Sequence, residues 1–275
     1  MSEFAAIQMA SGPNINSNLI EAGRLIADAA ESGAQLVVLP ENFAFLGQNE
    51  KDKLAVAEDA GNGRMQSFLS EQAAQHKIWL VGGTIPIKSG SGNKVRAACL
   101  VFNDAGEQVA RYDKIHLFDV QLTSNGEQYN ESEAIEAGDQ AVVIDSPFGR
   151  LGIAICYDLR FPELFRNMIG AGAEVIAMPS AFTAITGKAH WHVLVRARAI
   201  ENLCYVIAAD QGGYHVSGRE TYGHSMIVDP WGQVLDELAS GSGVVRASSD
   251  RVYLAKVRNS FPVLEHRRMP CRMSS

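Results

Sequence analysis

The chain has 275 residues, of which 47% are hydrophobic and 20% are charged, and its formal net charge is -7. This composition is typical of a soluble globular protein and excludes a disordered chain, while the acidic balance disfavours a nucleic-acid partner, which needs a basic surface. The sequence contains neither a run of roughly 18 apolar residues nor a signal-peptide pattern, so we expect no membrane span and a cytoplasmic location.

Strands and helices alternate along the first half of the chain. Leu19, Leu25 and Ile26 recur at helical spacing, and Gly33 follows as a helix stop. A turn at 103–106 separates two strand-like runs and predicts a hairpin. The predicted elements of this half are strands at 4–9, 36–39, 78–81, 94–102 and 108–112 and helices at 18–31 and 64–76.

The second half repeats the same alternation. Pro162 opens a predicted helix, and a turn at 229–232 joins two strands. No Pro-, Ser- or Gly-rich linker divides the halves, so we expect a single α/β domain over 1–275, with the segment 119–137 as the rim of an active site. The other predicted elements are strands at 151–155, 175–178, 204–209, 225–228 and 233–238 and a helix at 188–202.

Three apolar strands end at residues that carry chemistry. The run 152–155 ends at Cys156, the run 36–39 ends at Pro40 and Glu41, and the strand around 109–113 leads to Lys114. If one sheet edge gathers these ends, a nucleophile, a carboxylate and an ammonium meet in one pocket. That combination predicts an acyl-transfer enzyme with a cysteine nucleophile.

Each of these residues also has a simpler interpretation by itself. Cysteine is commonly buried in a core, which is how we interpret Cys99 and Cys204, and a glutamate or lysine at a strand end is usually paired or solvated.

No histidine stands out in the sequence as the partner of a papain-like catalytic cysteine. His190 and His192 are two residues apart on a predicted helix and point in different directions, whereas His116 and His224 stand alone, so we expect no metal site and no cofactor. The four cysteines, Cys99, Cys156, Cys204 and Cys271, show no zinc-ribbon spacing.

Taken together, three ordered motifs resemble the nitrilase superfamily of carbon-nitrogen hydrolases over nearly the whole chain. They are Leu39-Pro40-Glu41-Asn42-Phe43, Tyr112-Asp113-Lys114-Ile115-His116-Leu117-Phe118 and the stretch from Gly152 to Glu163 around Cys156. The resemblance implies a four-layer α-β-β-α sandwich, a homodimer or higher homo-oligomer, usually dimerised through helices of the second half, and a Glu41–Lys114–Cys156 site.

The resemblance also assigns roles to individual residues. Cys156 would attack as a thiolate and form a thioester, Glu41 would act as general base and then acid, and Lys114 would stabilise the oxyanion with the backbone N–H of Tyr157. A further family glutamate falls on Glu131 in the rim, where it would position substrate nitrogen or water. Phe182 and Thr183 fall in a stretch expected to bind substrate.

Within the superfamily, the chain looks most like the Nit branch. The residues that carry this likeness are 179–183, 186–191, 196–202, 222–225 and 229–232. The branch implies an amidase for a small carboxylate-bearing amide, giving acid and ammonia, with deaminated glutathione as the first expectation. The alternatives are an ω-amidase for α-ketoglutaramate or succinamate, a carbamoylase, and a catalytically silent binding protein on the same fold.

One position departs from the branch and bears on substrate binding. Lys188 stands where members of the branch carry proline. Lys188 and Arg219 are candidates for binding substrate carboxylates on charge alone, and we expect both to be solvated surface residues.

Overall fold

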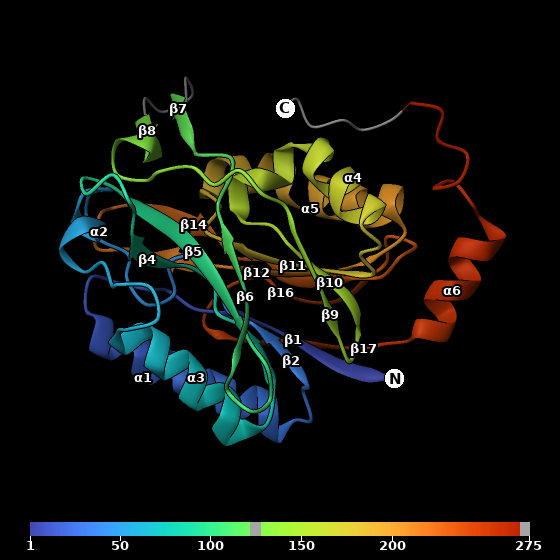
Figure 1. Ribbon diagram of the computed structural model, residues 1–275, viewed down its shortest axis with the longest axis horizontal. Helices are drawn as coiled ribbons and strands as arrows, with labels where there is room; N and C mark the ends of the chain where they lie inside the picture. Colours follow the sequence, from blue (N-terminus) through green and yellow to red (C-terminus); the bar gives the residue numbers. More distant parts are fainter. Residues whose placement is uncertain (122–127, 270–275) are drawn as a thin grey trace.

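Two mixed β-sheets pack face to face between two layers of helices in the computed structural model, which describes residues 1–121 and 128–269 (Figure 1). Helices α1 (Ile15–Glu31) and α3 (Arg64–His76) cover the first sheet, and α4 (Pro162–Gly170) and α5 (Ala184–Asn202) cover the second. This arrangement confirms the expected four-layer α-β-β-α sandwich.

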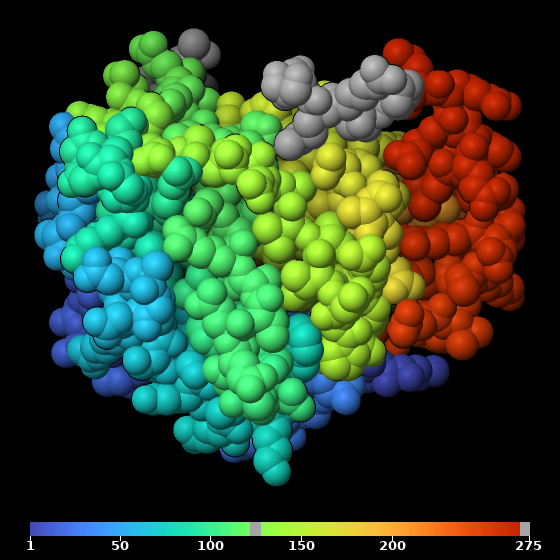
Figure 2. Space-filling view, viewed as in Figure 1, coloured from blue at the N-terminus to red at the C-terminus, as the bar shows by residue number. Residues whose placement is uncertain are grey.

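The first sheet combines strands from both ends of the chain. Its order is β17 (Gly243–Ser249), β1 (Ser2–Gln8), β2 (Leu36–Val38), β3 (Trp79–Val81), β5 (Val95–Phe102) and β4 (Ile85–Lys88), and β6 (Gln108–Asp113) also pairs with β5. Strand β17 runs antiparallel to β1 with Ser2 opposite Ser249. In the space-filling view the red C-terminal segment accordingly lies along one edge beside the blue N-terminal strand (Figure 2).

The second sheet is built from the second half alone. Its order is β16 (Val234–Leu238), β15 (Ser225–Val228), β12 (Tyr205–Asp210), β11 (Val175–Ser180), β10 (Gly149–Ile153) and β9 (Val142–Ser146). Smaller elements complete the described chain: α2 (Asp52–Ala55), α6 (Arg251–Ser260), the ribbon of β7 (Asp119–Gln121) and β8 (Gln128–Asn130), the ribbon of β13 (Gly212–Tyr214) and β14 (Glu220–Tyr222), and short 3₁₀ helices at Glu131–Glu133 and Cys156–Arg160.

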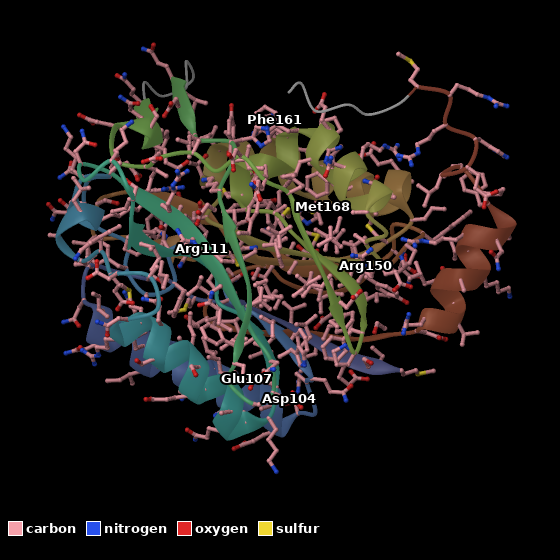
Figure 3. All side chains as sticks on the ribbon, in the orientation of Figure 1. Asp104, Glu107, Arg111, Arg150, Phe161 and Met168 are labelled. Atoms are coloured by element: carbon pink, nitrogen blue, oxygen red, sulfur yellow. The ribbon has the colours of Figure 1, made fainter. Side chains whose placement is uncertain are left out.

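Alternation along the strands explains how the layers form. In β1, Phe4 and Ala6 pack in the core shared by the two sheets, whereas Ala5 and Ile7 pack beneath α1 and α3. Both faces of the strand are buried, so it reads as a continuous apolar run. On the other side, Met168 of α4 lies close against Gly152, where an added Cβ would come within 2.8 Å of the Met168 sulfur (Figure 3).

Helices α1 and α5 begin three and four residues earlier than predicted, in each case after a residue whose side chain caps the helix. Helix α3 has the predicted bounds, and α1 begins earlier than predicted because the Asn14 side chain accepts a hydrogen bond from Ser17 N–H. Helix α5 begins after Thr183, whose side chain accepts a hydrogen bond from Thr186 N–H. None of the described helices is long and apolar enough to cross a membrane. The single domain over 1–275 stays a prediction, and Cys271 lies outside the described residues.

Candidate active site

The segments that leave β2, β6 and β10 bring Glu41, Lys114 and Cys156 together. Lys114 Nζ lies 2.7 Å from Glu41 Oε1, and the Cys156 thiol lines one small hollow together with both residues. All three are buried, with exposed fractions of 3% for Glu41, 1% for Lys114 and 7% for Cys156. Two ionisable side chains and a thiol buried in contact are a hallmark of a functional site.

Glu131 of the rim segment joins this group. Lys114 Nζ lies 2.9 Å and 2.8 Å from the two Glu131 oxygens, and the Phe118 N–H donates to Glu131 Oε2 at 2.7 Å. The ammonium of Lys114 therefore lies between two carboxylates. The part of the rim at 122–127 lies outside the described residues.

The charges of the three groups depend on one another. Burial by itself lowers the pKa of Lys114, but Glu131 and Glu41 outweigh it and raise that pKa well above its usual range. Burial by itself raises the pKa of Glu41, yet the Lys114 ammonium, with hydrogen bonds from Lys114 and Cys156, holds it below its usual value. Burial, together with repulsion from Glu41, leaves the pKa of Glu131 raised despite Lys114. Glu41 is thus the stronger acid of the two carboxyl groups.

The Cys156 thiol rests in its protonated form. Burial raises its pKa well above that of an ordinary thiol and Glu41 raises it further, against smaller opposite effects of Lys114 and the Ala181 backbone. A thiolate therefore forms only when Glu41 takes the thiol proton.

A strained backbone holds Cys156 at the start of a helical turn. Its φ is +46°, a left-handed conformation that non-glycine residues rarely adopt and that clusters at functional sites. It begins the 3₁₀ helix Cys156–Arg160, so the Tyr157 N–H lies in a first turn, where backbone donors have no partner within the helix. The Tyr157 ring packs against Phe118 and Phe161.

Asp158 ties the cysteine turn to the lysine strand, a role that the sequence did not suggest. Its carboxylate accepts from the Ile155 N–H at 2.8 Å and the Tyr112 hydroxyl at 2.7 Å. It also accepts from the His116 N–H at 3.1 Å and lies 2.7 Å from His116 Nδ1. The His116 ring in turn stacks on Phe161 at 3.7 Å between centroids, just before α4 (Figure 3).

Two adjoining hollows open beside Cys156. The first is lined by Glu41, Lys114 and Glu131 and also by Glu50, Lys53, Tyr129 and Arg219. The second is lined by Tyr157, Phe182 and Thr183 and again by Arg219. The structure thus gathers six predicted residues around the Cys156 thiol: Glu41, Lys114, Glu131, Tyr157, Phe182 and Thr183.

The cationic residues at these hollows differ from the expectation. Lys188 is exposed on α5, as expected, but Arg219 is half-buried and lines both hollows. Its guanidinium lies 5.3 Å from the Tyr129 ring centre and donates to the Ala181 carbonyl, while its buried Nε finds no hydrogen-bond partner among the described residues. Sequence reasoning missed Lys53, which pairs with Glu50 at 2.6 Å.

Metal-type ligands gather elsewhere. Among the described residues, His192, His224 and Glu237 have their ligand atoms within 4.8 Å of one another. We call them the histidine cluster. None of the three lines the hollows beside Cys156.

Comparison with known proteins agrees with this geometry. The carbon-nitrogen hydrolase family matches residues 4–259. A Synechocystis protein named deaminated glutathione amidase is 45% identical over 96% of this chain and 97% of its own. The crystal structure of Saccharomyces cerevisiae Nit3, a member of branch 10 of the nitrilase superfamily, superimposes with a TM-score of 0.86 at 33% identity, covering 95% of this chain and 94% of that one.

A third structure is that of a mutant of the amidase from Nesterenkonia sp. AN1, in which acrylamide has undergone Michael addition at the active-site cysteine. It superimposes with a TM-score of 0.78 at 26% identity, covering 95% of this chain and 98% of that one. The chain therefore belongs to the carbon-nitrogen hydrolase family and is an enzyme that hydrolyses carbon–nitrogen bonds.

Proposed function

We propose that this chain is an amidase that hydrolyses deaminated glutathione through a thioester on Cys156. The observation that carries the proposal is the burial of the Cys156 thiol in one hollow with Glu41, which shares the ammonium of Lys114 with Glu131. This group contains a nucleophile, a base and a cation, so the reaction requires no cofactor.

The first half-reaction forms the thioester. Cys156 Sγ attacks the amide carbon while Glu41 takes the thiol proton, and the carbonyl oxygen becomes an oxyanion. Lys114 and the Tyr157 N–H stabilise that oxyanion. The tetrahedral intermediate then collapses, the carbon–nitrogen bond breaks, and Glu41 returns the proton to the leaving amine.

The second half-reaction regenerates the thiol. Water attacks the thioester carbon and gives a proton to Glu41, the carbon–sulfur bond breaks, and the proton passes to sulfur as the acid leaves. Glu131 holds Lys114 from the side opposite Glu41 and supports its position in both steps. Every proton that Glu41 accepts is returned in the same half-reaction, so the cycle closes.

The charge at the hollows supports an anionic substrate. Deaminated glutathione keeps both carboxylates of glutathione and lacks its amino group. Arg219 lines both hollows and has a buried nitrogen without a partner among the described residues, so it is suited to bind one carboxylate. Phe182 and Thr183 line the second hollow and would contact the acyl chain.

The product of this substrate differs from the expectation of ammonia. The amide of deaminated glutathione joins an α-keto dicarboxylic acyl group to a dipeptide, so its cleavage releases a dipeptide amine. Ammonia is released only from primary amides such as α-ketoglutaramate and succinamate. An ammonia assay alone would therefore miss the proposed activity.

The experiment is to measure kcat/KM for deaminated glutathione and α-ketoglutaramate with one enzyme preparation, following the common acid product. We expect deaminated glutathione to be favoured at least about tenfold. A preference for α-ketoglutaramate would move the assignment to an ω-amidase and leave the roles of Glu41, Lys114 and Cys156 unchanged. No turnover of either amide would favour a carbamoylase.

We propose further that the chain forms a homodimer in the cytoplasm. Apolar side chains are exposed on α5 and near α6, with 69% for Val193, 58% for Trp231 and 47% for Phe261, as expected of a face that a second copy covers. The described cysteines, Cys99, Cys156 and Cys204, are free, as in a reducing compartment. Sedimentation of the full chain at the monomer mass would contradict the dimer, and recovery in an extracellular fraction would contradict the location.

A further inference from the structure

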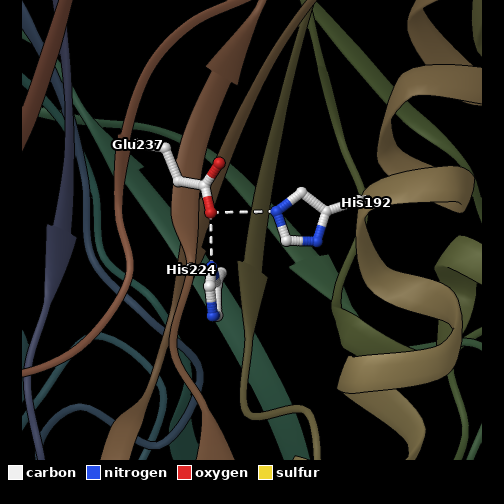
Figure 4. Close-up of side chains that lie close together, drawn as sticks. All are labelled: His192, His224 and Glu237. Atoms are coloured by element: carbon white, nitrogen blue, oxygen red, sulfur yellow. Dashed lines mark hydrogen bonds and ion pairs between the residues drawn. The ribbon is translucent and has the colours of Figure 1, made fainter.

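The histidine cluster lies where three elements meet, away from the hollows at Cys156. His192 comes from α5, His224 from the turn between β14 and β15, and Glu237 from β16. His192 Nε2 lies 2.9 Å from Glu237 Oε1, and His224 Nδ1 is bonded to the same oxygen (Figure 4). One carboxylate oxygen thus lies between two imidazole nitrogens.

We propose that His192, His224 and Glu237 form a binding site for a divalent transition-metal ion of the zinc class. Two imidazoles and one carboxylate are a ligand set that zinc uses, with water in the fourth position. Ligand atoms of a tetrahedral zinc site lie about 3.4 Å apart. The three ligand atoms here lie within 4.8 Å of one another, so small rotations of the side chains would bring them to that spacing.

The backbone around the cluster is fixed by other contacts. Trp191, the neighbour of His192, donates from its indole N–H to the His224 carbonyl at 2.8 Å, which holds α5 against the turn. His224 itself has a φ of +55°, a strained conformation for a residue with a side chain. The Tyr222 ring stacks on His224 at 4.2 Å between centroids. These contacts orient the imidazole groups before any ion arrives, which favours binding.

Charge and access also suit a cation. Glu237 brings a carboxylate to the two imidazoles, so the cluster offers an oxygen ligand beside two nitrogen ligands. The side chains are 36%, 25% and 27% exposed for His192, His224 and Glu237, which leaves an entry path from solvent. Two imidazole ligands favour zinc over magnesium or calcium, which prefer oxygen ligands.

The test is a zinc titration of the full chain carrying Cys156→Ala, which removes the active-site thiol as a competing ligand. We expect one zinc ion per chain, no response to magnesium, and a higher Tm with zinc than without it. His192→Ala and Glu237→Gln, each in the same background, should weaken zinc binding at least about tenfold. Removing a side chain that only hydrogen-bonds a metal ligand already lowers metal affinity by that factor, and removing a ligand should lower it at least as much. His190→Ala is the matched control, because His190 is exposed on the same helix and lies outside the cluster.

Cobalt(II) supplies a spectroscopic readout of the ligand set itself. In the active wild-type chain we expect visible bands of a low-coordinate cobalt site without a sulfur-to-cobalt charge-transfer band. Those bands should be lost in Glu237→Gln and retained in His190→Ala. Absence of stoichiometric zinc binding, or equal binding by His192→Ala, Glu237→Gln and their parent, would overturn the proposal.

Discussion

The carboxylate of Asp158, two residues after Cys156, accepts a hydrogen bond of 2.7 Å from the hydroxyl of Tyr112, two residues before Lys114. Both side chains are fully buried. The same carboxylate caps the turn of Cys156 through the Ile155 N–H. One buried group therefore fixes the position of the nucleophile relative to the ammonium.

Tyr112→Phe tests this link because it keeps the ring and removes the hydroxyl. A hydrogen bond to a buried charge contributes about 1.5–3 kcal/mol, so we expect the free energy of unfolding to fall by that amount. We also expect kcat to fall about tenfold with KM little changed, because the nucleophile loses its alignment. Urea unfolding and steady-state kinetics measure both effects.

Tyr253→Phe is the control for that variant. Its hydroxyl lies 3.3 Å from Asp229 Oδ2 in a more exposed setting. We expect a change of at most about 0.5 kcal/mol and unaltered kinetics. Equal effects of the two substitutions would show that the Tyr112–Asp158 contact has no special role.

Lys114→Met removes the cation and leaves Glu41 and Glu131 buried together. We expect kcat to fall by a factor of about 100 to 1000, with substrate binding affected less, because the oxyanion exists only during reaction. The two carboxyl groups then lack a counter-charge, so their pKa values rise above those in the unfolded chain. The variant should therefore be least stable at high pH and gain stability as the pH falls and a proton binds.

The second variant for this prediction is Lys114→Met with Glu131→Gln. Removing one of the two facing carboxylates should restore stability at neutral pH without restoring activity. If Lys114→Met raised KM and left kcat unchanged, Lys114 would only bind substrate.

The dependence of kcat/KM on pH above neutrality tests the protonation states of Cys156 and Lys114 in the free enzyme. The raised pKa values of Cys156 and Lys114 keep both groups protonated to a higher pH than usual. The thiol proton is the one that Glu41 later gives to the leaving amine. We therefore expect kcat/KM to stay within about twofold between pH 7 and 9. A decline centred near about 8.5, the pKa of an ordinary thiol, would contradict the assignment.

Arg219→Met tests recognition of the substrate carboxylate. We expect kcat/KM for deaminated glutathione to fall about 10- to 100-fold, as for loss of a charge-assisted hydrogen bond. An uncharged amide of similar length should be affected much less. Lys188→Met is the matched control, because Lys188 is exposed on α5 and lines neither hollow. Equal losses for the anionic and uncharged amides would exclude a role in charge recognition.

The sequence predicted the parts of the site that depend on local pattern. Glu41 and Cys156 follow short buried apolar runs and could be named in advance from that pattern, whereas β6 before Lys114 is only partly buried and Lys114 was identified from the family motif around it. Helix α3 could be bounded because Met65, Leu69 and Ala73 recur on one buried face.

What the sequence could not predict depends on contacts between distant segments. Tyr129 and Arg219 come from two other segments, and only the fold places them in the lining of a hollow with Cys156. Pairing of β17 with β1 joins the two ends of the chain, and no local pattern marks that pairing. The sequence did not predict the histidine cluster for the same reason, because His192 lies close to His224 in space and does not pair with its sequence neighbour His190.

The central claim is a covalent thioester on Cys156, and rapid-quench mass spectrometry of the enzyme with deaminated glutathione tests it most directly. The account predicts that the α-keto dicarboxylic acyl group is found on the peptide that contains Cys156 and on no other cysteine. It also predicts that Cys156→Ala keeps its fold and loses both adduct and turnover, whereas Cys99→Ala keeps both. Appreciable turnover by Cys156→Ala, or an acyl adduct elsewhere on the chain, would contradict the account.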